Sequence, residues 1–205
     1  STNLMKNIGI MGGTFDPPHV GHLMIAEYVR EALDLEEVRF IPTGQIYYKD
    51  SSRTADPDDR LEMVRLAIAG NTRFTADAME IEREGDTYTF ETLEALKAAE
   101  PETAFTFIVG ADSLDYMERW RHPERIFQCC SVAAVLRPGF SGEQMTEKKK
   151  ELEQQFHARI EIVPAPLIRI SSTELRQRLA EGKSVRYLIP EAVAEYIARH
   201  GLYRP

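Results

Sequence analysis

Two histidines three residues apart follow a pair of glycines near the beginning of the sequence, in the run GGTFDPPHVGH at residues 12–22. Residues spaced by three project from the same face of a helix, so His19 and His22 would present both imidazoles to one ligand, and Gly21 keeps side-chain bulk away from that face. Paired glycines let backbone N–H groups approach a bulky anion, and a helix N-terminus attracts negative charge. The spacing therefore predicts a phosphate-binding turn between a strand and a helix.

Other chemistry fits this run less well. A histidine pair at this spacing is a weak zinc site unless a further ligand lies nearby. The G-x-G-x-x-G spacing of dinucleotide-binding folds is absent. The plain structural alternative is a tight strand-to-helix turn that carries two incidental polar histidines.

A second anion-binding pattern lies about 150 residues further along, in the run ISSTELR that ends at Arg176. Ser171 and Glu174 have the spacing of a capping box, which predicts that a helix begins there. The cap does not use the hydroxyls of Ser172 and Thr173, which could therefore bind an anion, and the arginine adds a cation to the same turn. Three hydroxyls alone are weak evidence, but together with the histidine run they predict two cradles for one polyphosphate.

Apolar runs alternate with amphipathic segments over most of the chain, which is typical of a parallel sheet with helices on both faces. The predicted fold class is α/β, a Rossmann-like doubly wound parallel sheet with C-terminal helices. Ligands of such sheets bind at the carboxyl edge, at the topological switch point. Strands are predicted at residues 7–11, 38–41, 104–109, 131–136 and 159–163, with one more inside 74–81, and helices at 19–33, 57–69, 88–99, 143–156, 171–181 and 190–199, besides a short helix ending at 126–127.

The length of 205 residues suits one domain, residues 1–205, in which 171–205 form a C-terminal helical part and 1–4 are interpreted as a vector-derived remnant. A net charge of -8 and a pI of about 5.2 do not favour binding to nucleic acid or to anionic membranes. No membrane span or signal peptide is recognisable, so a cytoplasmic location is expected. The neighbours Cys129 and Cys130 are interpreted as ordinary thiols without a disulfide.

The histidine run resembles the first signature of the nucleotidylyltransferase superfamily, whose shared element is H-x-G-H or T-x-G-H. With histidine at the first position and the Asp-Pro-Pro lead-in, it most resembles the bacterial nicotinate-nucleotide adenylyltransferases. The run ISSTELR resembles the second signature of that family, ISST-x-x-R, which binds the β and γ phosphates of ATP. The Arg-Thr-x-Gly-Ile-Ser-Thr-Thr element of sister cytidylyltransferases is absent. The resemblance covers residues 6–203 and favours ATP as the nucleotide.

This resemblance implies which residues contact ATP. Both histidines would contact the phosphates, Arg137 of an Arg-Pro-Gly motif would lie close to them, and Asp112 of a Gly-Ala-Asp motif would lie near the ribose. On the residues alone, Arg137 could equally be a solvated loop arginine and Asp112 a helix N-cap. The implied catalytic residues are His19, His22 and Arg176. The implied ATP-binding residues are Gly12, Gly13, Thr14, Phe15, His19, His22, Gly110, Asp112, Arg137, Ser171, Ser172, Thr173 and Arg176.

The resemblance also implies an acceptor pocket. The only tryptophan would stack on a pyridine ring, although a lone tryptophan more often serves packing, and the amides of the Thr-Tyr-Thr turn would meet the nicotinate carboxylate. One departure lies after the second strand, where the family usually has Pro-Pro-His-Lys and this chain has Ile-Tyr-Tyr-Lys, so that Tyr48 replaces the histidine. The surrounding loop, residues 43–57, is a hypothetical lid. The implied acceptor-binding residues are Lys49, Thr87, Tyr88, Thr89 and Trp120.

The expected activity is transfer of AMP from ATP to nicotinate mononucleotide, giving nicotinate adenine dinucleotide and pyrophosphate in NAD biosynthesis. The attacking phosphate oxygen is already ionised near neutral pH, so positioning and charge stabilisation suffice. Mg²⁺ is expected mainly on the ATP phosphates, and no protein ligand for it is named. Nicotinamide mononucleotide and phosphopantetheine remain alternative acceptors, and a non-catalytic ATP-sensing domain is the alternative of another class. The expected partners are these small molecules, with no nucleic acid or membrane, and a homo-oligomer remains open.

Overall fold

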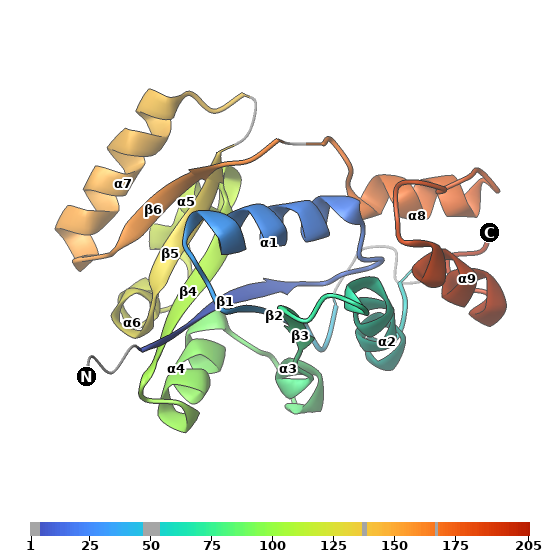
Figure 1. The fold of residues 1–205 in the computed structure, drawn as a ribbon, viewed down its shortest axis with the longest axis horizontal. Helices are drawn as coiled ribbons and strands as arrows, with labels where there is room; N and C mark the ends of the chain where they lie inside the picture. The colour runs from blue at the N-terminus through green and yellow to red at the C-terminus, as the bar shows by residue number, and fades with distance from the viewer. Residues whose placement is uncertain (1–4, 47–53, 137–138, 167) are drawn as a thin grey trace. The chain divides into compact units, whose positions relative to one another are not determined.

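The computed structural model describes residues 5–46, 54–136, 139–166 and 168–205. The chain forms two compact units whose segments alternate along the sequence (Figure 1). The first unit comprises Ser1–Met11, Ile25–Arg39 and Thr87–Leu167, and the second comprises Gly12–Met24, Phe40–Asp86 and Ile168–Pro205. The expected single domain stays a prediction.

Six strands form one sheet in the order β3-β2-β1-β4-β5-β6. The registers of β1 with β4, β4 with β5, and β5 with β6 are parallel. The order of the strands reverses between β1 and β4, as it does in a doubly wound sheet. The predicted Rossmann-like α/β class is therefore confirmed. The strands are β1 (Lys6–Gly13), β2 (Glu37–Pro42), β3 (Phe74–Ala76), β4 (Thr103–Gly110), β5 (Ser131–Leu136) and β6 (Ile160–Pro164).

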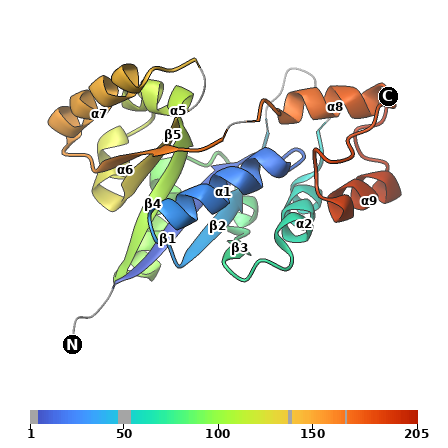
Figure 2. The ribbon, with the colours of Figure 1, turned by 45° about the horizontal axis from the view of Figure 1, so that its top comes forward.

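Four helices and one 3-10 helix of the described chain lie wholly within the first unit. Four consecutive residues of β5, from Val132 to Val135, are buried, which is the pattern of a strand covered on both faces. Helix α4 packs against α6, and α7 lies along β6 and contacts α5 (Figure 2). These elements are α4 (Thr89–Ala99), α5 (Ala111–Tyr116), η2 (Met117–Arg119), α6 (Pro123–Cys129) and α7 (Gly142–Phe156).

The second unit has its own apolar cluster. Met63 from α2, Leu175 from α8 and Val193 from α9 are buried together in it. Helices α2 and α9 also share a polar contact, in which the Tyr196 hydroxyl donates to Asp59 at 2.6 Å. The helices are α2 (Pro57–Ile68), α3 (Met79–Glu82), α8 (Ser172–Ala180) and α9 (Glu191–His200), and α1 (Val20–Ala32) begins in this unit.

The predicted strands, including the one inside residues 74–81, and the longer predicted helices exist with small shifts at their ends. Strand β3 ends at Ala76, after which the Asp77 carboxylate accepts a hydrogen bond from the Met79 N–H and the chain turns into α3. The structure corrects two details. The short helix predicted to end at 126–127 continues to Cys129, and α5 and η2 were not predicted. Asp112 is not a helix N-cap, since Gly110 holds that position for α5. Both cysteines are free, as predicted.

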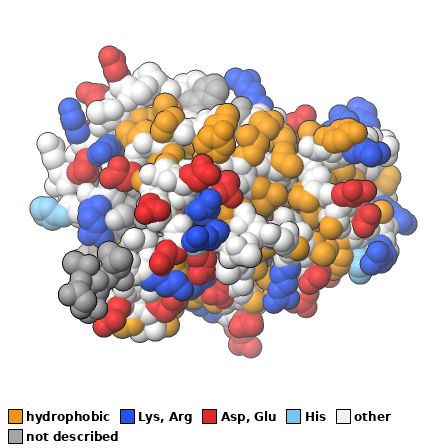
Figure 3. Space-filling model, viewed as in Figure 1, with side chains coloured by type: hydrophobic (Ala, Val, Ile, Leu, Met, Phe, Trp, Pro, Cys, Tyr) orange, Lys and Arg blue, Asp and Glu red, His pale blue; other side chains and the backbone are white. Residues whose placement is uncertain are grey.

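Charged side chains of both signs are intermixed on the face of the molecule shown in Figure 3. Within the described ranges, no helix combines the length and the apolar character that crossing a membrane requires. Because the chain has a net charge of -8, binding of an anion depends on local hydrogen-bond donors and cations, whose positions determine where a site can lie.

Gly44, just beyond β2, generates a test of the packing in the second unit. A Cβ there would lie 2.6 Å from the backbone carbonyl oxygen of Glu80, which cannot move as a side-chain end could. We expect Gly44→Ala to lower the free energy of unfolding by about 1–3 kcal/mol, the usual cost of overpacking. Urea unfolding followed by circular dichroism measures this loss. Gly142→Ala is the control, since open space surrounds Gly142, and an equal effect of both substitutions would contradict the contact.

Candidate active site

The turn between β1 and α1, residues 12–22, is the histidine loop of the second unit. Its two imidazole rings are stacked, with centroids 3.8 Å apart and planes at 28°. The backbone N–H of His19 donates to Nδ1 of His22 at 3.0 Å, and the backbone N–H of Gly21 donates to Nδ1 of His19 at 3.0 Å. Both rings are thus oriented by the backbone of the loop itself, as the spacing predicted for one shared face.

These two hydrogen bonds define the protonation of both rings. A nitrogen that accepts a hydrogen bond carries no proton, so each neutral ring carries its proton on Nε2. Burial lowers the pKa of His19 from 6.5 to about 4. Burial, and then repulsion by His19, lowers the pKa of His22 well below 6.5. Near neutral pH the pair therefore offers two neutral Nε2–H donors, and no hydrogen bond to either Nε2 is found among the described residues.

Two neighbours keep the imidazoles in place. A Cβ at Gly21 would lie 2.8 Å from Cε1 and 2.9 Å from Nδ1 of His19, so glycine is required for this ring position. The Phe15 ring, 1% exposed, meets His22 edge-on with centroids 4.9 Å apart. The Phe15 side chain therefore supports the imidazole of His22, and the contact of Phe15 with ATP stays a prediction.

The beginning of α8 contacts the histidine loop directly, within the same unit (Figure 1). The Ser172 hydroxyl donates to the carbonyl oxygen of Pro17 at 2.8 Å, and Nη1 of Arg176 donates to the carbonyl oxygen of Asp16 at 2.9 Å. Nη2 of Arg176 also donates to the Thr173 hydroxyl at 3.3 Å. Two sequence segments that were predicted to serve one ligand are therefore adjacent in space.

The cap of α8 is the one that the sequence predicted. The Ser171 hydroxyl accepts a hydrogen bond from the Glu174 N–H at 3.1 Å, and Ser171 is exposed. Arg176 is buried, and its guanidinium holds α8 against the loop. Arg176, which was predicted to be a site residue, therefore links α8 to the histidine loop.

Asp16 lies at the centre of these contacts, although no sequence pattern predicted a role for it. Its side chain is fully buried and accepts hydrogen bonds from the Ala55 N–H at 3.0 Å and from the Tyr203 hydroxyl. Nη1 of Arg176 lies 3.8 Å from the second carboxylate oxygen. Burial, together with the charge and the hydrogen bond of Asp16, raises the pKa of Tyr203 far above its usual value, so the phenol stays a donor.

Arg60 is the second residue that sequence reasoning missed. It is fully buried in α2 and donates to the carbonyl oxygens of Thr14 at 2.9 Å and Thr43 at 2.6 Å. It also donates to the carbonyl oxygens of Ala55 and Gly44. One guanidinium therefore ties the loop after β1 to the loop after β2. One sequence signal could have indicated its burial: Arg60 lies four residues before Val64, and so on the apolar face of the predicted helix.

The remaining predicted ATP residues fall into three groups. Gly12, Gly13 and Thr14 form the exit from β1 in the second unit, where the Gly13 carbonyl oxygen accepts from the Thr43 N–H at 2.9 Å. Gly110 and Asp112 are exposed at the beginning of α5 in the first unit. Arg137 and the acceptor residue Lys49 lie outside the described residues, as does Tyr48, and so do residues 47–53 of the hypothetical lid.

The other predicted acceptor residues do come together, in the first unit. Thr87, Tyr88, Thr89 and Trp120 line a pocket of about 220 Å³ that Arg121 and Ile126 complete. The indole of Trp120 is half-buried and meets the Phe107 ring of β4 edge-on, with centroids 5.9 Å apart. Arg121 was not among the predicted site residues, although its neighbour Trp120 was.

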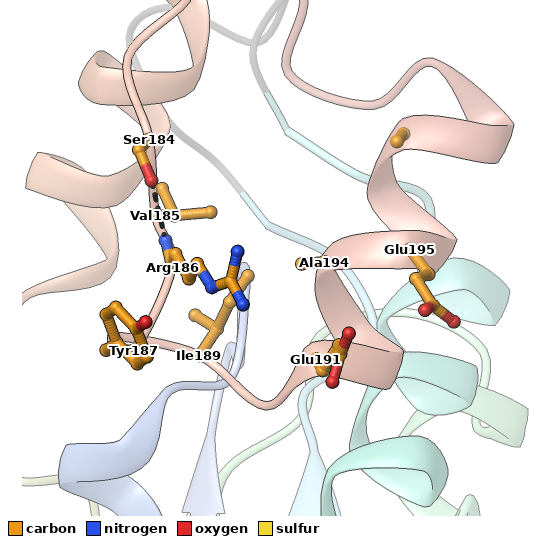
Figure 4. Close-up of a pocket in the computed structure, with 9 residues that line it drawn as sticks. Ser184, Val185, Arg186, Tyr187, Ile189, Glu191, Ala194 and Glu195 are labelled. Carbon is orange, nitrogen blue, oxygen red and sulfur yellow. Dashed lines mark hydrogen bonds between the residues drawn. The ribbon is translucent and has the colours of Figure 1, made fainter.

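A larger cavity, about 500 Å³, lies elsewhere in the second unit, between the segment 184–189 and α9 (Figure 4). Arg186 and Tyr187 line it on one side, with the guanidinium carbon 5.3 Å from the centroid of the ring, and Glu191 and Glu195 line it on the other. None of its lining residues belongs to the predicted site. Cavity size alone therefore does not identify the reacting centre in this chain.

The fold and the histidine loop belong to a recognisable class, since residues 10–178 match the model of the cytidylyltransferase-like family. A protein of Lachnoclostridium phytofermentans named probable nicotinate-nucleotide adenylyltransferase is 42% identical over 199 residues, covering 97% of this chain and 100% of that protein. A protein of Dehalococcoides mccartyi with the same name is 44% identical over 196 residues, covering 95% and 96% of the two chains. The chain belongs to the nicotinate-nucleotide adenylyltransferase family.

A solved structure of the Plasmodium falciparum nicotinic acid mononucleotide adenylyltransferase, complexed with NaAD, is similar in fold. It has a TM-score of 0.79 and 21% sequence identity, and 97% of each chain is covered. At this identity the similarity concerns the fold.

The lowered pKa of His19 predicts an acid-dependent loss of stability. The unfolded chain binds this proton below about pH 6.5 and the folded chain only below about pH 4, so stability is complete above pH 6.5 and decreases as the pH falls between the two values. The full loss is on the order of 3 kcal/mol. We expect urea unfolding at about pH 7.5 and about pH 5 to show a larger decrease for the wild type than for His19→Asn. Equal decreases would contradict the buried neutral imidazole.

Proposed function

We propose that this chain transfers AMP from ATP to nicotinate mononucleotide, releasing pyrophosphate and giving nicotinate adenine dinucleotide for NAD biosynthesis in the cytoplasm. The observation that carries the proposal is the contact between the histidine loop and the beginning of α8. Ser172 and Arg176 bind the carbonyl oxygens of Pro17 and Asp16, so two helix N-termini and two imidazoles adjoin in one unit. The names of the relatives, at 42% and 44% identity, supply the acceptor.

The triphosphate of ATP is assigned to this junction. The Nε2–H groups of His19 and His22 donate to phosphate oxygens, and the helix ends at the beginnings of α1 and α8 contribute partial positive charge. Neutral imidazole donors suit a role in which the rings donate hydrogen bonds to the phosphates without proton transfer. The buried Arg176 contributes through the position of α8 as well as through its charge.

The reaction is an in-line displacement. An oxygen of the acceptor phosphate attacks the α-phosphorus of ATP, a new phosphorus–oxygen bond forms, and the bond between the α-phosphorus and the bridging oxygen of pyrophosphate breaks. The attacking oxygen is already ionised, so no general base is needed. The remaining requirement is stabilisation of charge on the phosphates, for which preorganised donors are the usual solution.

The acceptor ring is assigned to the pocket of the first unit. Trp120 provides a flat indole surface, and the beginning of α4 provides backbone N–H groups at Thr87, Tyr88 and Thr89. Gly110, Asp112 and Arg137 are assigned to ATP, and Lys49 to the acceptor phosphate, on the family signatures alone.

Mg²⁺ enters this proposal as the counter-ion of ATP. No group of three or more histidine, cysteine, aspartate or glutamate side chains that could hold a metal ion is found in the part of the chain that the structure describes. The described residues thus do not fit a protein-built metal cage, and every step above uses donors of the chain itself.

The direct test is release of pyrophosphate by the purified full chain with ATP and Mg²⁺. We expect turnover with nicotinate mononucleotide, and much slower turnover with nicotinamide mononucleotide or phosphopantetheine. Mass spectrometry should identify nicotinate adenine dinucleotide as the second product. Binding of ATP without turnover of any acceptor would reject catalysis and favour a sensing role.

The donor role of His22 can be separated from its role in holding the loop. His22→Ala removes the ring, whereas His22→Asn keeps an oxygen near the Nδ1 position to accept the His19 N–H but removes the Nε2–H donor. Both variants should lower kcat by about 10²–10³-fold, the usual cost of losing one transition-state donor. Thermal unfolding should show that His22→Asn keeps the wild-type fold. Near-normal turnover of His22→Asn would mean that His22 only shapes the loop.

A further inference from the structure

Arg121 is a cation in the acceptor pocket of the first unit. It follows Trp120 in the segment between η2 and α6, and it lines the 220 Å³ pocket together with the Thr-Tyr-Thr turn. The carbon of its guanidinium lies 4.4 Å from the centroid of the Tyr88 ring. An arginine held over an aromatic face keeps the N–H groups at its edge available for hydrogen bonds.

A second arginine beside this pocket shows the opposite arrangement. Arg125 of α6 lies over the Phe90 ring at 4.5 Å, and its Nε donates to Glu94 of α4 at 2.7 Å. Its charge is therefore compensated by a carboxylate. For Arg121, no carboxylate partner and no hydrogen bond occur among the residues that the structure describes. Of these two arginines, Arg125 is paired with a carboxylate, whereas Arg121, which lines the pocket, has none among the described residues.

A second feature of the pocket, the beginning of α4, favours the same sign of ligand charge. Helix α4, which has 11 residues, begins at Thr89, and its N-cap residue Tyr88 makes no side-chain cap. The first N–H groups of this helix thus have no side-chain acceptor from the N-cap, and the helix end carries partial positive charge. A flat ring on Trp120 would share the pocket with this helix end and with the guanidinium of Arg121. That combination fits a planar ring with a carboxylate substituent.

We propose that Arg121 is a specificity-determining residue, which selects an acceptor with an anionic ring substituent over one with a neutral carboxamide. This inference rests on the proposed function and deepens it, because it assigns the discrimination between nicotinate and nicotinamide mononucleotide to one side chain. The guanidinium pairs with the carboxylate through two parallel N–H donors, a geometry that a carboxamide cannot match. Both acceptors carry the same phosphate, so a phosphate contact would not discriminate between them.

The test compares Arg121→Gln with wild type on both acceptors. Loss of a hydrogen bond to a charged group predicts a rise of about 10–100-fold in KM for nicotinate mononucleotide, with kcat nearly unchanged. The KM for nicotinamide mononucleotide should stay within about twofold. Arg121→Lys, which keeps the charge but loses the planar fork, should be intermediate. The matched control is Arg119→Gln, since Arg119 lies over Tyr116 at 5.5 Å and does not line the pocket.

Two outcomes of this comparison would overturn the proposal. Equal rises in KM for both acceptors would mean that Arg121 contacts the phosphate or only supports the pocket. Unchanged KM values for both would mean that it does not contact the acceptor.

A binding measurement separates this inference from the proposed function. Trp120 is the only tryptophan of the chain, so quenching of its fluorescence reports on this pocket without turnover. Quenching by nicotinate mononucleotide that is weakened in Arg121→Gln supports the inference even if no pyrophosphate is released, in which case only the proposed function fails. Absence of quenching in the wild type would overturn the inference itself.

Discussion

The buried carboxylate of Asp16 is the interaction on which the histidine loop depends. It joins the Ala55 N–H, the Tyr203 hydroxyl and the guanidinium of Arg176, which come from three distant parts of the second unit. A fully buried carboxylate is costly unless donors surround it, so these segments are stable together or not at all. The same residue supplies the carbonyl oxygen that fixes Arg176. The tip of α8 and the two imidazoles are thereby held in one arrangement before any ligand binds.

Preorganisation also explains why the imidazoles are neutral. Each ring uses Nδ1 to accept a backbone N–H of its own loop, so protonation at Nδ1 would remove a hydrogen bond that shapes the loop. Burial acts in the same direction on the pKa of His19 and His22. Two charged imidazolium rings would attract a phosphate more strongly, but the neutral rings of this loop offer two N–H donors of fixed direction. For a reaction that moves charge along a triphosphate, donors that need no reorganisation are the more useful choice.

Local patterns predicted this chemistry better than long-range ones did. The spacing of His19 and His22 and the cap at Ser171 are properties of a single turn each, and both are found as predicted. The hydrogen bond from the Tyr203 hydroxyl to Asp16 joins residues 187 positions apart, and no local sequence pattern predicts it. The role of Arg60 could not be predicted, because its four acceptors are backbone carbonyl oxygens that carry no sequence signal. The apolar pattern of residues 74–81 predicted a strand but not its end, which coincides with a side-chain hydrogen bond that Asp77 accepts from the Met79 N–H.

The two units place positive charge differently, and the difference follows from what each must bind. In the second unit, the candidate phosphate site combines neutral imidazoles with helix ends, and the charge of Arg176 faces Asp16. A polyphosphate has many oxygens and can be held by many weak donors, whose summed strength still allows pyrophosphate to leave. In the first unit, the pocket faces a small ring on which a single substituent must be distinguished. One uncompensated guanidinium suits that task, because a carboxylate and a carboxamide differ mainly in charge. On a chain with net charge -8, such a guanidinium is available to a ligand only if it does not pair with a carboxylate of the protein. The stacking of Arg121 on Tyr88, rather than beside an acidic residue, achieves that separation.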